Sequence, residues 1–243
     1  MLIFLLLGAA FVFVCFSVFF RVRAVEVVGA AKYTPEQIKE VCGFEEGQSL
    51  YGVSGDLSRL HERLPYIKGA KLTRKLPYTL VVTVTEDEAA YYCRLYGEYF
   101  ALSEDLRVLE RSAEPETFAG EGCTELLLPE IDSAVVGGKI VFTRDSDEKY
   151  VRAYLEVLST NVLRDRVTAF DLRDKFDLKL QCDSIYLVEL ADGADLATKL
   201  TTTAAVLSEE EAFPVGVPAK IDVTNPSSPS AIVSKRVDIS FDQ

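Results

Sequence analysis

The hydrophobic residues of this chain form one long run at its start and alternate with polar residues after it. Residues 1–20 contain no charged side chain. A helix of about 20 apolar residues, rising about 1.5 Å per residue, spans the roughly 30 Å hydrocarbon core of a bilayer. Because lipid offers the backbone no hydrogen-bond partner, a spanning segment has to be helical. The pattern predicts a transmembrane helix over residues 1–20.

An uncleaved anchor explains this run better than a signal peptide does. A cleaved signal peptide starts with basic residues and ends at a small-x-small site. Here no basic residue precedes the run, and it ends in the bulky, charged sequence FFRVR at residues 19–23. Arg21 and Arg23 would favour a cytoplasmic location for the domain after the run, but that rule is weak for large translocated domains. Charge alone therefore leaves the orientation open.

Residues 21–86 alternate between strand and helix patterns. Val25 and Val27 flank a glutamate in a short half-buried strand. Thr34 and Gln37 have the spacing of a helix N-terminal capping box, and Gly43 ends that helix. A second helix is expected from about residue 54 to 64, and strands are expected at 67–72 and 80–85. The order strand, helix, helix, strand, strand predicts a small α+β module with both helices on one face of a sheet.

Two runs in this module resemble a known domain. Residues 64–74 read LPYIKGAKLTR, and residues 76–86 read LPYTLVVTVTE. They are similar to the POTRA pattern P-x-V-x-x-A-x-V-x-R followed by P-x-T-L-x-I-x-V-x-E. One POTRA domain after one anchor is the arrangement of the FtsQ/DivIB family of bacterial cell-division proteins. The junction at residues 86–90 departs from the family, because it lacks the usual arginine and proline.

Residues 87–243 predict a mostly β domain with two helices, and resemble the β-domain of that family. Residues 111–122 read as an exposed loop. Helices are expected at 147–161 and about 195–207. Strands are expected at 167–172, 177–182, 185–190 and 219–223, with a further edge strand at 231–233. The expected domains are therefore 1–20, 21–86 and 87–243.

Composition excludes some functions. Acidic residues outnumber basic ones by 38 to 26, for a formal net charge of -12, whereas a nucleic-acid site needs clustered lysine and arginine. None of the five cysteines has the spacing of a CxxC motif. Outside the cytoplasm the last four could form disulfides, and the alternative is that they are buried thiols. These cysteines are Cys15, Cys42, Cys93, Cys123 and Cys182.

The sequence motifs of catalysis are missing. The single histidine, His61, lies in a helical pattern, and neither GxSxG nor HExxH occurs. Asp171, Asp174 and Asp177 lack the glycine and distal glutamate of a calcium loop. We expect no enzyme activity and no catalytic, cofactor-binding or metal-binding residues.

The resemblance implies a non-catalytic single-pass membrane scaffold at the division septum, with its large domain outside the cytoplasm. Its partners would be FtsB/DivIC-like and FtsL-like membrane division proteins. Contact would come from strand addition to an exposed sheet edge. The candidate partner-binding residues are Thr224, Asn225, Ser227, Ala231 and Val233 near the C-terminus, with Tyr66 and Arg74 in the POTRA module. The alternative is an anchored module that binds an envelope ligand such as glycan, which the absence of tryptophan weakens. An envelope hydrolase is disfavoured by the missing motifs.

Overall fold

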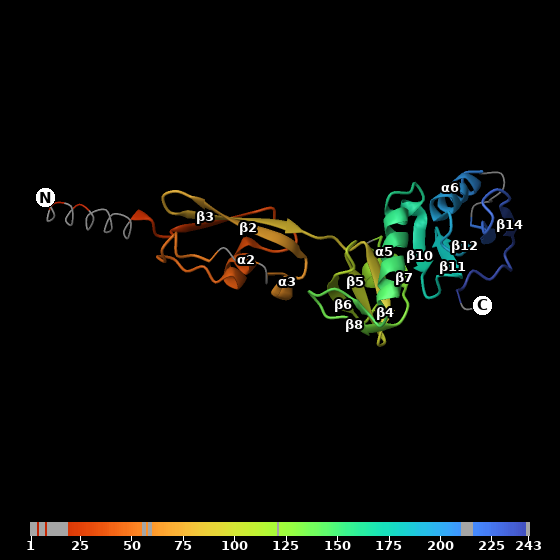
Figure 1. Cartoon of the computed structure of the whole chain (residues 1–243), viewed down its shortest axis with the longest axis horizontal. Coiled ribbons are helices and arrows are strands. Elements are labelled where there is room, and N and C mark those ends of the chain that lie inside the picture. The colour runs from red at the N-terminus through yellow and green to blue at the C-terminus, as the bar shows by residue number, and fades with distance from the viewer. Residues whose placement is uncertain are drawn as a thin grey trace. The chain divides into compact units, whose positions relative to one another are not determined.

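The structure is a computed structural model that describes residues 4, 8, 19–54, 57, 60–120, 122–209 and 216–241. It divides into two compact units, residues 1–88 with 136–138 and residues 89–135 with 139–243 (Figure 1). The predicted transmembrane segment at residues 1–20 lies almost wholly outside the described residues. Within the described part, no helix is long and apolar enough to cross a membrane.

The first unit has the predicted order of elements. These are β1 (Ala24–Val28), α2 (Pro35–Cys42), α3 (Leu60–Arg63), β2 (Ile67–Lys75) and β3 (Thr79–Glu86). The sheet order is β1-β3-β2, with β1 parallel and β2 antiparallel to β3. Four residues of the helix predicted from 54, namely 55, 56, 58 and 59, lie outside the described part, and α3 begins at Leu60.

The first helix of this unit is fixed by its own ends. The Thr34 hydroxyl accepts a hydrogen bond from the Gln37 amide at 3.3 Å, and the Gln37 side chain accepts one from the Thr34 amide at 2.8 Å. Gly43 has a φ of 65°, a left-handed conformation that glycine adopts at little cost. The predicted capping box and stop signal are both confirmed.

Two small hydrophobic clusters hold the first unit together. One lies between the helices and the sheet and contains Ile38, Leu60, Leu64, Ile67, Val82 and Val84. The other gathers where the chain enters the unit and contains Val22, Leu50, Val53 and Leu80. The second cluster anchors the loop at residues 47–53 against the start of the sheet.

The second unit is built on one nine-stranded sheet with the order β14-β13-β12-β11-β10-β7-β4-β5-β6. These strands are β4 (Tyr91–Leu95), β5 (Glu98–Leu102), β6 (Val108–Ser112), β7 (Thr124–Leu127), β10 (Val167–Asp171), β11 (Leu178–Cys182), β12 (Tyr186–Ala191), β13 (Ala219–Asp222) and β14 (Ser230–Val233). A separate two-stranded sheet pairs β8 (Ile131–Ser133) with β9 (Val141–Phe142). β7 joins the two halves of the large sheet, because it pairs in parallel with both β4 and β10.

Helices connect the parallel strands of this sheet. α5 (Asp145–Ser159) lies between β7 and β10 in the chain, and α6 (Leu196–Leu207) lies between β12 and β13. The α+β class is confirmed. The interpretation as a mostly β domain missed these parallel pairings, because they join strands far apart in the sequence.

The segment predicted as an exposed loop, 111–122, is mostly exposed but partly structured, so that prediction is correct only in part. β6 extends to Ser112, and α4 (Glu116–Ala119) follows. Phe118 is 1% exposed, and its ring lies 6.3 Å from that of Tyr92. One buried phenylalanine among polar residues fixes this segment, and a single turn of helix is too short to show a period in the sequence.

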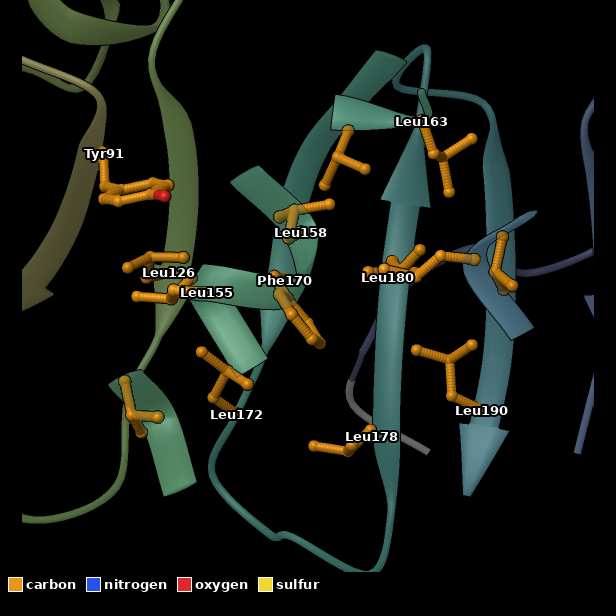
Figure 2. Close-up of a cluster of buried hydrophobic side chains, with 14 of the residues drawn as sticks. Tyr91, Leu126, Leu155, Leu158, Leu163, Phe170, Leu172, Leu178, Leu180 and Leu190 are labelled. Atoms are coloured by element: carbon orange, nitrogen blue, oxygen red, sulfur yellow. The ribbon is translucent and has the colours of Figure 1, made fainter. Parts of the chain in front are cut away.

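The main core lies between α5, α6 and one face of the large sheet. Figure 2 shows Leu155 and Leu158 from α5 lying near Phe170 and Leu126 from the sheet, with Leu180 and Leu190 farther along. Side chains that alternate with these point to the opposite face. There Gln181 donates a hydrogen bond to the Ile239 carbonyl at 3.5 Å. The C-terminal residues 237–241 therefore lie against the face of the sheet opposite the helices.

Candidate functional site: the β14 edge

β14 is the terminal strand of the large sheet. It pairs antiparallel with β13, so that Ala231 lies opposite Ile221 and Val233 lies opposite Ala219. Among the described residues, no strand follows β14 in the sheet order. The sequence-predicted residues Ala231 and Val233 thus lie on an edge strand.

The N–H and C=O groups of these two residues point away from β13, toward the open side of the edge strand. The Ser234 amide donates to the Pro218 carbonyl at 3.1 Å, which makes this pair a hydrogen-bonded pair. Hydrogen-bonded and non-hydrogen-bonded pairs alternate along an antiparallel ladder. Ile232 and Ser230 therefore direct their N–H and C=O groups toward β13. Those of Ala231 and Val233 point away from it.

The side chains of β14 differ between the two faces. Val233 is half-buried and packs against the main core. Ile232 points to the other face and is 64% exposed. The sequence reasoning left Ile232 out of the candidate residues, although the alternation of the strand marks it as the apolar side chain on the open face.

The other predicted residues of this region lie in the hairpin loop between β13 and β14. The Thr224 amide donates to the Asp222 carboxylate at 2.9 Å, and the Ser227 amide donates to the Asn225 side chain at 3.1 Å. Such turns use short polar side chains to hold the backbone locally. Thr224, Asn225 and Ser227 lie at the end of the edge, next to the strand rather than in it.

Tyr66 is mostly buried inside the first unit. It is 8% exposed, and its ring meets that of Tyr33 edge to face at 6.4 Å. The ammonium group of Lys32 lies 4.3 Å from the ring centroid. These contacts give Tyr66 a packing role in the unit.

Arg74 holds a loop. Its guanidinium donates to the Leu50 and Val53 carbonyls, each at 2.9 Å. Tyr66 directly precedes β2 and Arg74 lies eight residues farther along, which at roughly 3.3 Å per residue separates them by about 26 Å. The structure therefore does not bring Tyr66 and Arg74 together, and both belong to a different unit from the β14 edge.

Comparison with known proteins gives these elements a context. Residues 20–87 match the family described as POTRA domain, FtsQ-type, which covers the whole three-stranded sheet of the first unit. The chain thus contains a POTRA domain of FtsQ type and is similar to FtsQ/DivIB cell-division proteins. The match agrees with the resemblance noted in residues 64–86.

Curated members of this family resemble the chain beyond the POTRA domain. The cell division protein DivIB of Clostridium botulinum (strain Hall) is 25% identical over 211 residues, which are 86% of this chain and 81% of the relative. The cell division protein FtsQ of Corynebacterium glutamicum is 31% identical over 113 residues, or 44% of this chain and 51% of the relative. The likeness to DivIB is long enough to include much of the second unit. These relatives support a role in cell division.

The second unit also contains a pocket of about 270 Å³ beside α5. Tyr91, Glu104, Arg152 and Glu156 are among its lining residues. Arg152 is held by Glu148 at 2.8 Å, and Glu104 is held by Arg164 at 2.6 Å. Burial raises the pKa of Tyr91, so its hydroxyl stays protonated at neutral pH. Arg152 and Glu104 are thus held by charged residues next to the pocket, and structural ion pairs of this kind are common outside functional sites.

The cysteines are free thiols in the described part of the chain. Cys93, Cys123 and Cys182 are buried, and Cys42 is half-buried. Burial raises the pKa of Cys93 and of Cys182 to about 12, and that of Cys42 to about 11. A thiol with so high a pKa is a poor nucleophile, because the thiolate is the reactive form. The interpretation as buried thiols fits this arrangement. Cys15 lies outside the described residues.

Proposed function

We propose that this chain is a non-catalytic scaffold that links cell-division proteins outside the membrane at the septum. Residues 1–20 would anchor it as a single-pass protein, with the POTRA domain at 21–86 and the β-domain at 87–243 outside the cytoplasm. Its partners would be FtsB/DivIC-like and FtsL-like membrane division proteins. The FtsQ-type POTRA domain and the similarity to DivIB cell-division proteins support the cell-division setting.

The observation that carries the linking role is the open edge at β14. Ala231 and Val233 direct their main-chain groups away from β13. A partner segment in extended conformation would pair with these groups and add a tenth strand to the sheet. Each hydrogen bond formed would contribute about 0.5–1.5 kcal/mol net. Strand addition thus gives affinity through the backbone, whatever the partner's exact sequence.

Side chains on the two faces of the edge would add specificity. Ile232 would offer an exposed apolar neighbour on the open face, and Val233 would extend the main core on the other. Cross-strand apolar pairs contribute roughly 0.2–1 kcal/mol each. The partner strand is therefore expected to carry apolar residues on both faces where it lies beside Ile232 and Val233.

Co-purification of the full chain in detergent with the ectodomains of its FtsB/DivIC-like and FtsL-like candidates tests this proposal. Ala231→Pro removes an outward N–H, whereas the matched control Ala231→Val keeps it. An unpaired buried carbonyl on the partner costs about 1–3 kcal/mol, so Ala231→Pro should weaken capture by roughly 5- to 150-fold. Ala231→Val should bind nearly as the parent does.

Capture by folded Ala231→Pro at the level of Ala231→Val would contradict the use of the β14 edge. If the well-folded parent chain captures neither ectodomain, the proposed linking role itself is wrong. That second result would favour the alternative, an anchored module that binds an envelope ligand such as glycan.

A further inference from the structure

Three separate segments meet at one end of the first unit. They are residues 19–23 before β1, the loop at 47–53, and the turn at 74–78 between β2 and β3. The Leu50 amide donates to the Phe20 carbonyl at 2.8 Å, and the Arg23 amide donates to the Tyr78 carbonyl at 2.9 Å. These contacts fix the segments side by side at the end of the sheet where β1 and β3 begin.

This end of the unit exposes large apolar side chains from all three segments. Phe19 is 61% exposed, Tyr51 54%, Leu76 57% and Tyr78 43%. Beneath them, the buried Val22 and Leu50 belong to a single hydrophobic cluster that holds the surface in place. Single exposed apolar residues are ordinary on a protein surface, but a group of four on one end marks an interaction site.

Basic side chains come from two of the same segments. Arg23 lies 5.7 Å from the centroid of the Tyr78 ring, and Arg21 donates to the Gly47 carbonyl at 3.1 Å. Arg74 and Lys75 come from the third segment. The acidic neighbours are Glu26, which pairs with Lys75 at 3.5 Å, and Glu45 and Glu46 in the approach to the loop. The presence of four basic residues here contrasts with the net charge of -12 of the whole chain.

We propose that this end of the first unit, defined as the 19–23/47–53/74–78 surface, rests on the lipid headgroups of a membrane. The proposal rests on the membrane anchor assigned to residues 1–20 under the proposed function. The uncharged run 1–20 leads directly into this surface at Phe19, which places the surface within reach of the bilayer that holds the run. Tyrosine favours the boundary between water and acyl chains, and arginine and lysine pair with phosphate.

This arrangement gives Arg21 and Arg23 a role on the outer side of the membrane. Basic residues after an anchor ordinarily indicate the cytoplasmic side. Here both are built into the fold, one through the Gly47 carbonyl and one through the Tyr78 ring. Their charge would serve to bind headgroups, and the orientation would follow from the translocated domain.

Tryptophan fluorescence can test the contact directly, because the chain contains no tryptophan. Tyr78→Trp places one fluorophore on the surface. Val28→Trp is the matched control, since Val28 is 52% exposed at the far end of the strand that starts beside the surface. Each full-length variant is reconstituted in phosphatidylcholine–phosphatidylglycerol vesicles, recovered by flotation, and compared with and without brominated acyl chains.

If the proposal is right, brominated acyl chains quench the tryptophan fluorescence of Tyr78→Trp and not that of Val28→Trp. Interfacial groups lie roughly 5–10 Å into the boundary of headgroups and acyl chains, so the emission of Tyr78→Trp should fall about twofold and shift to the blue. Val28→Trp should keep its emission. If neither variant in floated vesicles changes its emission when the acyl chains are brominated, the proposed lipid contact of this surface is wrong, while the membrane anchor stands. Quenching of both variants would show that the lipid contact is not limited to this end of the first unit.

Failure of the protein to float with the vesicles would contradict both the membrane anchor and the lipid contact of this surface. That result is separate from the linking role, because capture of division proteins is measured in detergent. The two proposals can therefore fail independently.

Discussion

The two edges of the nine-stranded sheet are protected to different degrees. At β6 the chain itself covers the start of the edge. The backbone of Lys139 forms an isolated antiparallel β-bridge with that of Arg107, and the Ile140 amide donates to the Leu106 carbonyl at 3.1 Å. Charged residues come next in the strand, with Arg111 paired to Glu98 at 3.1 Å. Folded proteins commonly use such coverage and charge to prevent unwanted strand pairing.

β14 has neither kind of protection within the strand. Its four residues, Ser230–Val233, carry no charge, and the C-terminal residues contact Gln181 on a face of the sheet rather than lying along the edge. Pro226 and Pro229 lie in the hairpin loop before the strand, and Lys235 and Arg236 come only after it. Among the described residues, the sheet thus has one covered edge and one uncovered edge, and the uncovered edge is the better candidate for a partner.

The largest expected effect concerns the closed side. Phe118→Ala should lower the free energy of unfolding by about 3–5 kcal/mol, because it removes a fully buried ring from the segment after β6. Val233→Ala on the half-buried open edge should cost less than about 1.5 kcal/mol. Urea unfolding of both variants measures the difference. Similar losses for the two would mean that the edges are equally integrated into the core.

The second prediction concerns alternate residues on the open edge. Ile232→Pro removes an N–H that points toward β13, so it should destabilise the unit by about 1–3 kcal/mol. Ala231→Pro removes an outward N–H and should change the free energy of unfolding by less than about 1 kcal/mol. Urea midpoints would check this, and an equal loss would show that the assigned alternation of β14 is wrong.

The third prediction asks whether charge or coverage closes the β6 edge. Arg111→Val removes an exposed ion pair with Glu98, and exposed pairs contribute about 0–1 kcal/mol. Because residues 139–140 still cover the start of the edge, this change should not restore partner capture when combined with Ala231→Pro. Recovery of capture in the double variant would show that charge alone had closed β6.

The smallest expected effect concerns β7, the strand that joins the two halves of the sheet. Burial raises the pKa of Glu125, which the Tyr92 hydroxyl and Arg94 lower in part. A raised pKa means that the folded state binds the proton more tightly, so stability falls as pH rises from the ordinary value of 4.5 through the folded pKa.

Glu125→Gln removes this titration. The variant should therefore gain stability over the parent as pH rises from about 4 to about 7, with the difference read from paired thermal unfolding curves. A gain that shrinks with rising pH would contradict the assigned direction.

Local sequence signals predicted the parts of the fold that local contacts determine. The capping box of Thr34 and Gln37 depends on side chains three residues apart, and the helices at 145–159 and 196–207 show their apolar period directly. β7 was missed, because its four residues are recognisable only by their parallel pairing with β4 and β10. Phe118 was missed for the same reason, since its partner Tyr92 lies far away in the sequence.

The candidate site was only partly predictable. The apolar run 231–233 after a proline-containing break predicted an edge strand, and the resemblance marked it for a partner. Only the Ser234–Pro218 hydrogen bond shows which of its main-chain groups point outward. Tyr66 and Arg74 were taken from the resemblance, and the structure gives both contacts within their own unit. A motif identifies residues that a fold requires and residues that a partner contacts, and it cannot separate the two.

Amide hydrogen exchange of the full chain, with and without the captured ectodomain, tests the open edge most directly. A partner strand on β14 would slow exchange of the outward amides of Ala231 and Val233, while exchange in residues 108–112 of β6 would stay unchanged. Protection at β6 with none at β14, in a complex that forms, would contradict the account.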